Sequence, residues 1–314
     1  MKALRFDFKE KVNQAHERIR LATKRTPLEH SPALSELTGA KVYLKWENEQ
    51  LTGSFKFRGA LNKLRALSPE EKRRGVVSAS TGNHGLGLSL AAREEGVGFK
   101  LVLPATVSSS KRSRLREFEA DIIDYGESCE KAEIYARRLA AESGRTYVSP
   151  YNDEDIIFGQ GTIGLEIWED FPGVQDVLIP VGGGGLASGI AGYLKTLSAE
   201  IRTFGVEPRC SAFMAASLEA GRIVEVEEQE TIADAVAGGI EPGSITFPLC
   251  RKLLNGIFLV EEELIMQALA LLKERHDKIV EGAGALSLAA LMKESGRFSG
   301  RQVVLVVSGG NASI

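Results

Sequence analysis

Hydrophobic and polar positions alternate along the chain with two different periods. Short apolar runs rich in β-branched residues and bounded by polar residues are typical of buried strands. They lie at Val76–Val77, Leu101–Leu103, Ile122–Ile123, Val177–Val181, Phe204–Val206 and Val303–Val307. Amphipathic stretches of helical length lie between many of them, at Glu130–Glu142, Leu186–Leu197 and Leu264–Arg275. Strands that alternate with helices predict crossover units, so we expect an α/β fold with parallel-rich sheets flanked by helices.

Four junctions between predicted elements carry unusual residues. Sheets of this kind bind ligands where strands end and helices begin, so these junctions are the candidate sites. They are Thr52–Ala60 before a helical stretch, Ser80–Gly85 between a strand and an apolar helix, Gly182–Gly185 directly after Val177–Val181, and Ser308–Asn311 directly after Val303–Val307.

The most distinctive junction is a run of glycines, namely Gly182, Gly183, Gly184 and Gly185. Without Cβ atoms, such a backbone can curl until several N–H groups face one point. The helix that follows adds the positive end of its dipole, which suits a phosphate. A tight turn explains the glycines equally well. A nicotinamide dinucleotide site also stays open, because Glu207 follows at a tolerable distance for a ribose contact.

Lys56 stands between Phe55 and Phe57, close to glycines. Apolar surroundings favour the neutral amine of a lysine, and a neutral amine condenses with an aldehyde. The alternative is a surface lysine whose stem lies on an apolar face.

The remaining two junctions offer hydroxyl, amide and backbone donors. The Ser80–Gly85 turn suits a carboxylate at a helix start, although plain capping of the helix is an equal alternative. His84 in this turn is either an acid or base, or a structural histidine, and we favour the structural role. Ser308 can donate and accept a hydrogen bond at the sheet edge, or be a simple turn residue.

Composition narrows the function classes. The chain has 314 residues, enough for about two domains, and a formal net charge of -3 with no strong basic run. Nucleic acid is therefore not an expected partner. No apolar stretch approaches the roughly 20 residues that span a membrane, and no signal peptide is expected, so we expect a cytoplasmic protein. The three scattered cysteines have no metal-ligand spacing and fit small, buried, reduced thiols.

Taken together, the junctions resemble the serine/threonine dehydratase and serine racemase family of pyridoxal 5′-phosphate (PLP) enzymes. The resemblance covers the chain from Arg25–Leu28 to Ser308–Asn311, and Ser54–Ala60 and the glycine run carry most of it. Further matches are Lys45–Asn48, Gly159–Thr162 and Gly205–Pro208. The resemblance implies the two-domain PLP fold type II, which is tryptophan synthase β-like.

The resemblance also implies a role for each site residue. In that family the motif lysine, here Lys56, carries PLP covalently, and the preceding Phe55 packs near the ring. Asn83 would bind the phenolic oxygen, Gly182–Gly185 the phosphate, and Ser308 the pyridine nitrogen. The residues implied for substrate binding are Ser80, Thr81, Gly82, Asn83 and His84.

The reaction implied is β-elimination from a small hydroxy amino acid such as L-threonine or L-serine, giving a 2-oxo acid and ammonia. Lys56 would remove the α-proton as general base. A hydroxyl rather than a carboxylate at the pyridine nitrogen favours elimination over transamination. The alternatives are a serine racemase, a dehydratase of a less common 3-hydroxy amino acid, and a non-catalytic nucleotide-binding module.

Two positions depart from the family racemases. Thr81 stands where the racemases have a catalytic serine, and its extra methyl group stiffens χ1. Racemases of the group bind a divalent cation through a glutamate, a backbone carbonyl and an aspartate. Glu207 matches the glutamate, but Phe213 stands at the aspartate position and cannot coordinate a hard cation, so we expect no metal.

The resemblance implies a domain division as well. Residues 1–74 and 152–314 would form a discontinuous PLP-binding domain, and residues 75–151 a small substrate-binding domain. PLP would lie in the cleft between them, where domain closure excludes water. Relatives of this kind are commonly homodimers.

Overall fold

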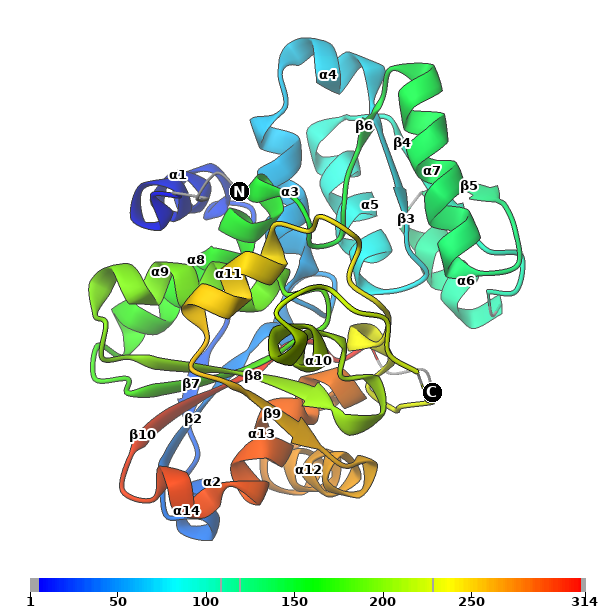
Figure 1. Cartoon of the computed structure of the whole chain (residues 1–314). Helices are drawn as coiled ribbons and strands as arrows, with labels where there is room; N and C mark the ends of the chain where they lie inside the picture. The colour runs from blue at the N-terminus through cyan, green and yellow to red at the C-terminus, as the bar shows by residue number, and fades with distance from the viewer. Residues whose placement is uncertain (1–5, 108, 119, 228, 312–314) are drawn as a thin grey trace.

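The computed structural model describes residues 6–107, 109–118, 120–227 and 229–311. The strands in these ranges form two separate sheets (Figure 1). The larger has the order β1-β2-β10-β7-β8-β9, and the smaller the order β5-β4-β3-β6. All pairings are parallel except β1 with β2, as expected when helices connect successive strands.

The strand bounds assign each sheet to distinct parts of the sequence. The larger sheet contains β1 (Leu28–His30), β2 (Lys41–Trp46), β7 (Asp176–Pro180), β8 (Arg202–Pro208), β9 (Ile257–Val260) and β10 (Gln302–Val307). The smaller contains β3 (Val76–Ala79), β4 (Phe99–Leu103), β5 (Asp121–Asp124) and β6 (Thr146–Tyr147). The smaller sheet therefore comes from one continuous segment, and the larger from the sequence on both sides of it.

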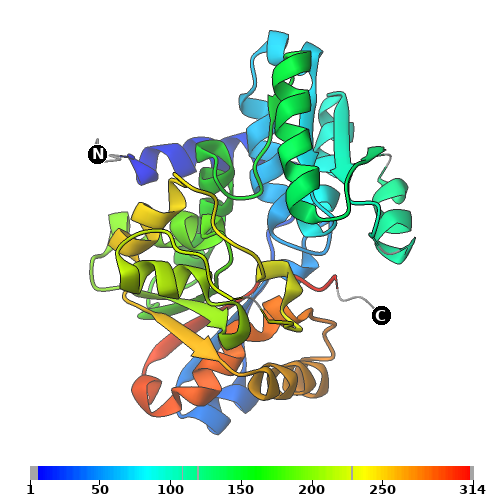
Figure 2. The same ribbon diagram turned by 45° about the vertical axis from the view of Figure 1, so that its right-hand side comes forward.

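The helices cover both sheets. They are α1 (Phe8–Ile19), α2 (Pro32–Thr38), α3 (Lys56–Ala66), α4 (Pro69–Arg74), α5 (Asn83–Glu95), α6 (Ser109–Glu117), α7 (Cys129–Ser143), α8 (Glu154–Asp170), α9 (Gly185–Leu197), α10 (Phe213–Ala220), α11 (Thr246–Leu253), α12 (Glu262–His276), α13 (Gly282–Lys293) and α14 (Ser295–Phe298). Short 3₁₀ turns lie at η1 (Glu47–Glu49), η2 (Arg209–Ser211) and η3 (Asp234–Val236). Figure 2 shows the same arrangement turned by 45°.

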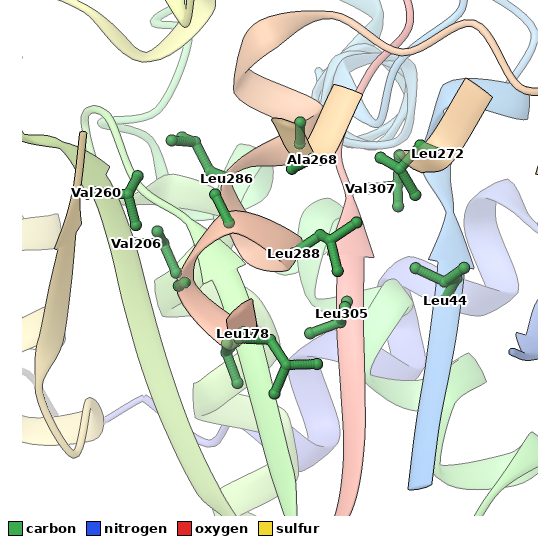
Figure 3. Packing of buried hydrophobic residues seen from close by; sticks show 14 of the residues in the cluster. Leu44, Leu178, Val206, Val260, Ala268, Leu272, Leu286, Leu288, Leu305 and Val307 are labelled. Atoms are coloured by element: carbon green, nitrogen blue, oxygen red, sulfur yellow. The ribbon is translucent and has the colours of Figure 1, made fainter. Parts of the chain in front are cut away.

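The core of the larger sheet lies against α12 and α13 on one face, as Figure 3 shows. Leucine and valine side chains from the strands interdigitate there with those of the two helices. The labelled members are Leu44, Leu178, Val206, Val260, Ala268, Leu272, Leu286, Leu288, Leu305 and Val307, each buried in the protein. A second cluster, with residues of α8, α9 and α11, covers the opposite face. Since both faces are buried, the central strands β7 and β10 are apolar over most of their length.

A cluster of buried charges lies beneath α3. The Arg58 guanidinium donates to Glu47 at 2.8 Å and to Glu166 at 2.6 Å, and the Lys45 ammonium donates to Glu166 at 2.5 Å. All four side chains are at most 3% exposed. Burial alone would lower the pKa of Arg58, but the two carboxylates outweigh it and raise the pKa. The cluster joins β2, η1, α3 and α8, and so fixes the start of α3 relative to the larger sheet.

Every predicted strand and amphipathic helix is confirmed in position. Pattern reasoning missed β1, β2, β6 and β9. In β2, the exposed Lys41 and the buried Lys45 interrupt the apolar run. The burial expected for the cysteines holds for Cys250 alone, since Cys129 is exposed and Cys210 is half-buried. Among the described helices, none has the length and apolar character needed to cross a membrane.

Candidate active site

The four junctions converge where strands of both sheets end. Ser308 follows β10, the glycine run follows β7, and the Ser80 turn follows β3. An isolated bridge between Ser54 and Gly309 joins the first junction to the last. The cavity between them is lined by Phe55, Lys56, Asn83, Tyr151, Gly182, Gly183, Gly184, Gly185, Leu186, Ala235, Val236, Glu281, Ala283 and Ser308.

Lys56 is the first residue of α3 and its amine reaches into this cavity. Its Nζ donates to the Pro150 carbonyl at 2.9 Å and lies 5.1 Å from the centre of the Phe55 ring. Loss of water around the amine lowers the pKa of Lys56 to about 8, and the Glu281 carboxylate offsets this only in part. A substantial share of the amine is therefore neutral near physiological pH, as a nucleophile and base requires.

Glu281 lies opposite Lys56 and is 6% exposed. It occupies the N-cap position of α13 but makes no capping bond with its side chain. Instead, its Oε1 accepts a hydrogen bond from Asn83 Nδ2 at 2.7 Å. Burial raises the pKa of Glu281 to about 7, and the Asn83 bond opposes the rise. A Cβ at position 309 would lie 2.3 Å from Glu281 Oε1, so a side chain there would displace this carboxylate.

Asn83, the first residue of α5, is held at both ends of its amide. Its Oδ1 accepts from Asn311 Nδ2 at 2.6 Å, and the same Asn311 nitrogen donates to the Thr52 carbonyl at 2.8 Å. Because Glu281 takes one N–H of Asn83, the direction of the amide is set and one N–H stays available for a ligand.

The Ser80 turn forms one wall of an adjoining pocket of about 540 Å³. Lys56, Asn83 and Glu281 line both this pocket and the cavity. The other predicted substrate-binding residues, Ser80, Thr81, Gly82 and His84, line the pocket as well. Across its mouth, Lys111 of α6 pairs with Asp234 at 3.1 Å, and Arg114 donates to Asn311. The size fits a small amino acid.

The His84 ring supports the turn. Ser78 Oγ donates to the Val148 carbonyl at 2.8 Å, so this hydroxyl can only accept from His84 Nε2, 3.1 Å away. Nε2 therefore carries the proton. Burial, with a smaller contribution from the charge of Lys56, lowers the pKa of His84 to about 3. A neutral ring bound to β3 and to the residue after β6 agrees with the structural role predicted for this histidine.

The glycine run forms a concave backbone at the start of α9. Gly184 is the N-cap, with a φ of +84° that disfavours other residues. A Cβ on Gly183 would lie 2.4 Å from the Tyr151 ring. The first N–H groups of α9 have no acceptor within the helix, so they are donors for an anion.

Glu207 and Phe213 do not fit a divalent cation. The two Glu207 oxygens accept the Met214 and Ala215 backbone N–H groups, each at 2.8 Å, at the start of α10. The Phe213 side chain packs in the apolar core. Among the described residues, no group of three or more His, Cys, Asp or Glu side chains is placed to hold a metal. Glu207 serves as a helix cap instead.

Sequence reasoning missed Glu281 and Tyr151. Glu281 precedes an apolar helix and carries no local signal, since its partner Asn83 lies 198 positions away. Tyr151 packs on Gly183, and its hydroxyl accepts the Glu241 backbone N–H at 2.8 Å. The tyrosine directly follows Pro150, whose carbonyl binds Lys56, so one short segment contacts both the amine and the glycine run.

Comparison with known proteins places this geometry in context. A family model described as pyridoxal-phosphate dependent enzyme matches residues 19–309. An L-threonine ammonia-lyase of Thermotoga maritima is 42% identical over 305 residues, which is 97% of this chain and 76% of the relative. A catabolic L-threonine dehydratase of Escherichia coli K12 is 37% identical over 305 residues, covering 96% and 92% of the two chains. The structure of maize serine racemase superposes with a TM-score of 0.93 at 32% identity, over 98% of this chain and 94% of that one.

Proposed function

This chain belongs to the family of pyridoxal-phosphate-dependent enzymes, and on that premise we propose that it eliminates water and ammonia from a small hydroxy amino acid such as L-threonine or L-serine. The observation that carries the proposal is a single amine. Lys56 lies within reach of both the substrate-sized pocket and the glycine run, and has a pKa of about 8.

The residues of the cavity fit PLP. Lys56 would hold its aldehyde carbon, the Gly182–Gly185 backbone its phosphate, and the second N–H of Asn83 its phenolic oxygen. Ser308 would face the pyridine nitrogen and Phe55 would pack near the ring. When bound, PLP supplies an electron sink for the charge that develops at the substrate α-carbon.

The substrate carboxylate would lie at the start of α5. The backbone N–H groups of the Ser80 turn and the dipole of this 13-residue helix favour an anion there. His84, as a neutral ring, holds the turn against Ser78 of β3 and the Val148 carbonyl, so it keeps the loop in place without taking up a proton.

Lys56 would then move the α-proton. Its neutral amine accepts a proton, and the nearby Glu281 carboxylate stabilises the resulting ammonium. No other lysine or histidine lines both the pocket and the cavity among the described residues. This makes Lys56 the general base of the proposal.

Racemisation is the second candidate. Thr81 lines the same pocket as Lys56, and the structurally similar maize protein is named a serine racemase. A hydroxyl on the second face of the substrate would return the proton from the opposite side. A chiral assay after incubation with L-serine separates the candidates, because accumulation of D-serine requires this second group.

Three further features belong to the proposal. The two sheets suggest the division into residues 1–74 with 152–314 and residues 75–151, with the reaction at their boundary. We also propose a homodimer in the cytoplasm. Equilibrium sedimentation tests the dimer, and subcellular fractionation tests the location.

The decisive experiment measures 2-oxo acid formation from L-serine, L-threonine and larger 3-hydroxy amino acids. The PLP-loaded enzyme should act on at least one of the first two, and the Lys56→Ala variant on none. Borohydride reduction followed by peptide mass spectrometry should place the cofactor on Lys56. A modified residue elsewhere, or normal turnover by Lys56→Ala, would overturn the proposal.

A further inference from the structure

The first turn of α11 contacts the glycine run, and the helix packs on α9 (Figure 1). Thr246 begins this helix and is fully buried. Its Oγ1 donates to the Gly183 carbonyl at 2.6 Å. The structure thus gives the loop a partner that lies outside the cavity lining described above.

The hydrogen bonds behind the loop have one direction. A carbonyl only accepts, so the Thr246 proton goes to Gly183. Ser244 Oγ lies 2.7 Å from Thr246 Oγ1, and Ser244 must be the donor of that bond. Ser244 is also buried, at 3% exposure. Ser244 therefore donates to Thr246, and Thr246 donates to the Gly183 carbonyl. In such a chain each hydrogen bond strengthens the next.

The bond to Gly183 sets the direction of the next N–H. In a trans peptide the carbonyl of one residue and the N–H of the following residue point in opposite directions. Because the Gly183 carbonyl points toward α11, the Gly184 N–H points away from it. The Gly184 carbonyl accepts from the Ser188 N–H at 2.9 Å within α9, so the Gly185 N–H points out of the helix start. The directions of two successive N–H groups are thus set by the hydrogen bonds of the preceding carbonyls.

We propose that Thr246, assisted by Ser244, is a positioning residue that turns the Gly184 N–H toward the phosphate of the cofactor. The inference rests on the proposed binding of PLP and adds a residue that acts through the loop without touching the ligand. Donation to the Gly183 carbonyl also polarises the shared peptide group, so the Gly184 N–H becomes a stronger donor.

The test compares PLP with pyridoxal, which lacks the phosphate. Thr246→Val keeps the shape of the side chain and removes the donor, so it should weaken PLP binding about 3- to 10-fold, the size of one neutral hydrogen bond. Pyridoxal binding should not change. Thr246→Ser, which keeps the hydroxyl, should restore PLP affinity. Equilibrium dialysis of the full-length apo protein measures both ligands.

Thr38→Val is the matched control. Thr38 is 6% exposed, and its hydroxyl donates to the Leu34 carbonyl at 2.7 Å in α2, which does not line the cavity. It should lose a similar amount of stability in urea with no change in PLP affinity. Should Thr246→Val fail to fold, Ser244→Ala keeps the Thr246 hydroxyl but removes its donor, together with the acceptor of the Thr246 backbone N–H at 3.3 Å. It should give a smaller loss of PLP affinity, again without effect on pyridoxal.

The outcomes separate this inference from the proposed function. Equal PLP affinity in the wild type and Thr246→Val, or equal losses for PLP and pyridoxal, would refute the positioning role alone. A wild-type protein that binds neither ligand through Lys56 would refute the proposed function instead.

Discussion

Two basic residues at the start of α3 lie in opposite electrostatic environments. Arg58 points into the buried cluster, where Glu47 and Glu166 raise its pKa. Lys56, two residues earlier, has a backbone carbonyl as its hydrogen-bond partner, and loss of water lowers its pKa to about 8. One turn of helix thus carries the permanently charged Arg58 on the side of the buried cluster and the titratable amine of Lys56 on the side of the cavity. The difference shows that two hydrogen-bonded carboxylates keep a buried basic group permanently charged. A buried amine whose hydrogen-bond partner is a backbone carbonyl can instead lose its proton and react.

The largest expected effect is the loss of activity when the amine of Lys56 is removed. Lys56→Met should lower the rate of 2-oxo acid formation by at least about 10³-fold, because the general base is lost. The free energy of unfolding of the apo protein should change by no more than about 1 kcal/mol, the scale of one neutral hydrogen bond. Coupled keto-acid assays and urea titrations measure the two quantities. A large loss of stability would show that Lys56 is structural like Arg58.

For Arg58 we expect the reverse, namely a large loss of stability. Arg58→Met leaves Glu47 and Glu166 buried with fewer partners, so unfolding should become easier by roughly 3–5 kcal/mol. The matched control is Arg25→Met, because Arg25 also binds two carboxylates, Glu169 and Asp170, but is 47% exposed. That change should cost less than about 1 kcal/mol. If urea titration gives equal losses for both variants, burial does not distinguish the two sites.

The sequence predicts features that depend on local motifs, but not those that depend on contacts between residues far apart in the chain. The glycine run and the Lys56 segment could be singled out from the sequence, since each is a continuous string of residues next to a predicted strand or helix. The Lys45–Glu166 pair was not, because its members lie 121 positions apart and Lys45 reads as an interruption of a strand. Glu281 was missed for the same reason. The hydrophobic period predicted the α/β class with parallel-rich sheets, whereas the two-domain division came from the family resemblance. The partners that set each charge appear only after folding.

Glu281 sharpens the comparison because its carboxylate favours the charged form of Lys56. Glu281→Gln removes a negative charge that favours the ammonium, so the pKa of Lys56 should fall below about 8. The rate at which the apo protein captures PLP requires the neutral amine and rises with pH. Its midpoint should therefore move to lower pH in the variant, as stopped-flow absorbance measures across pH 6–9. The other charged groups that influence Glu281 are Asp234 and Arg114, and both are retained. A midpoint that stays or rises would contradict the assigned charge coupling.

The pH dependence of stability gives a smaller and independent signal. Burial raises the pKa of Glu281 in the folded protein from its ordinary value of 4.5 to about 7, so the folded state holds this proton more tightly. The contribution of such a group to stability is therefore lost as the pH rises from about 4.5 to about 7. Urea titrations of the apo protein in this window should show a shallower decline for Glu281→Gln than for the wild type. Parallel curves would mean that the acid does not titrate there.

The smallest expected change concerns His84, whose protonation state should stay constant near neutral pH. The ring is buried like Arg58 but has no carboxylate, and its Nε2–H is engaged with Ser78. A second proton would have to enter at Nδ1 of a ring that has lost its water, and the charge of Lys56 adds a smaller opposing effect, so the pKa of His84 lies near 3. The imidazole signals of this residue, assigned by their loss in His84→Gln, should stay constant in NMR spectra from pH 5 to 8. Burial thus keeps His84 neutral, and it lowers the pKa of Lys56 because the Glu281 carboxylate offsets the loss of water only in part. The two residues differ because imidazole is already uncharged near neutral pH, whereas an amine must first give up a proton. A titration of His84 inside this range would restore the ring as a second acid or base in the pocket.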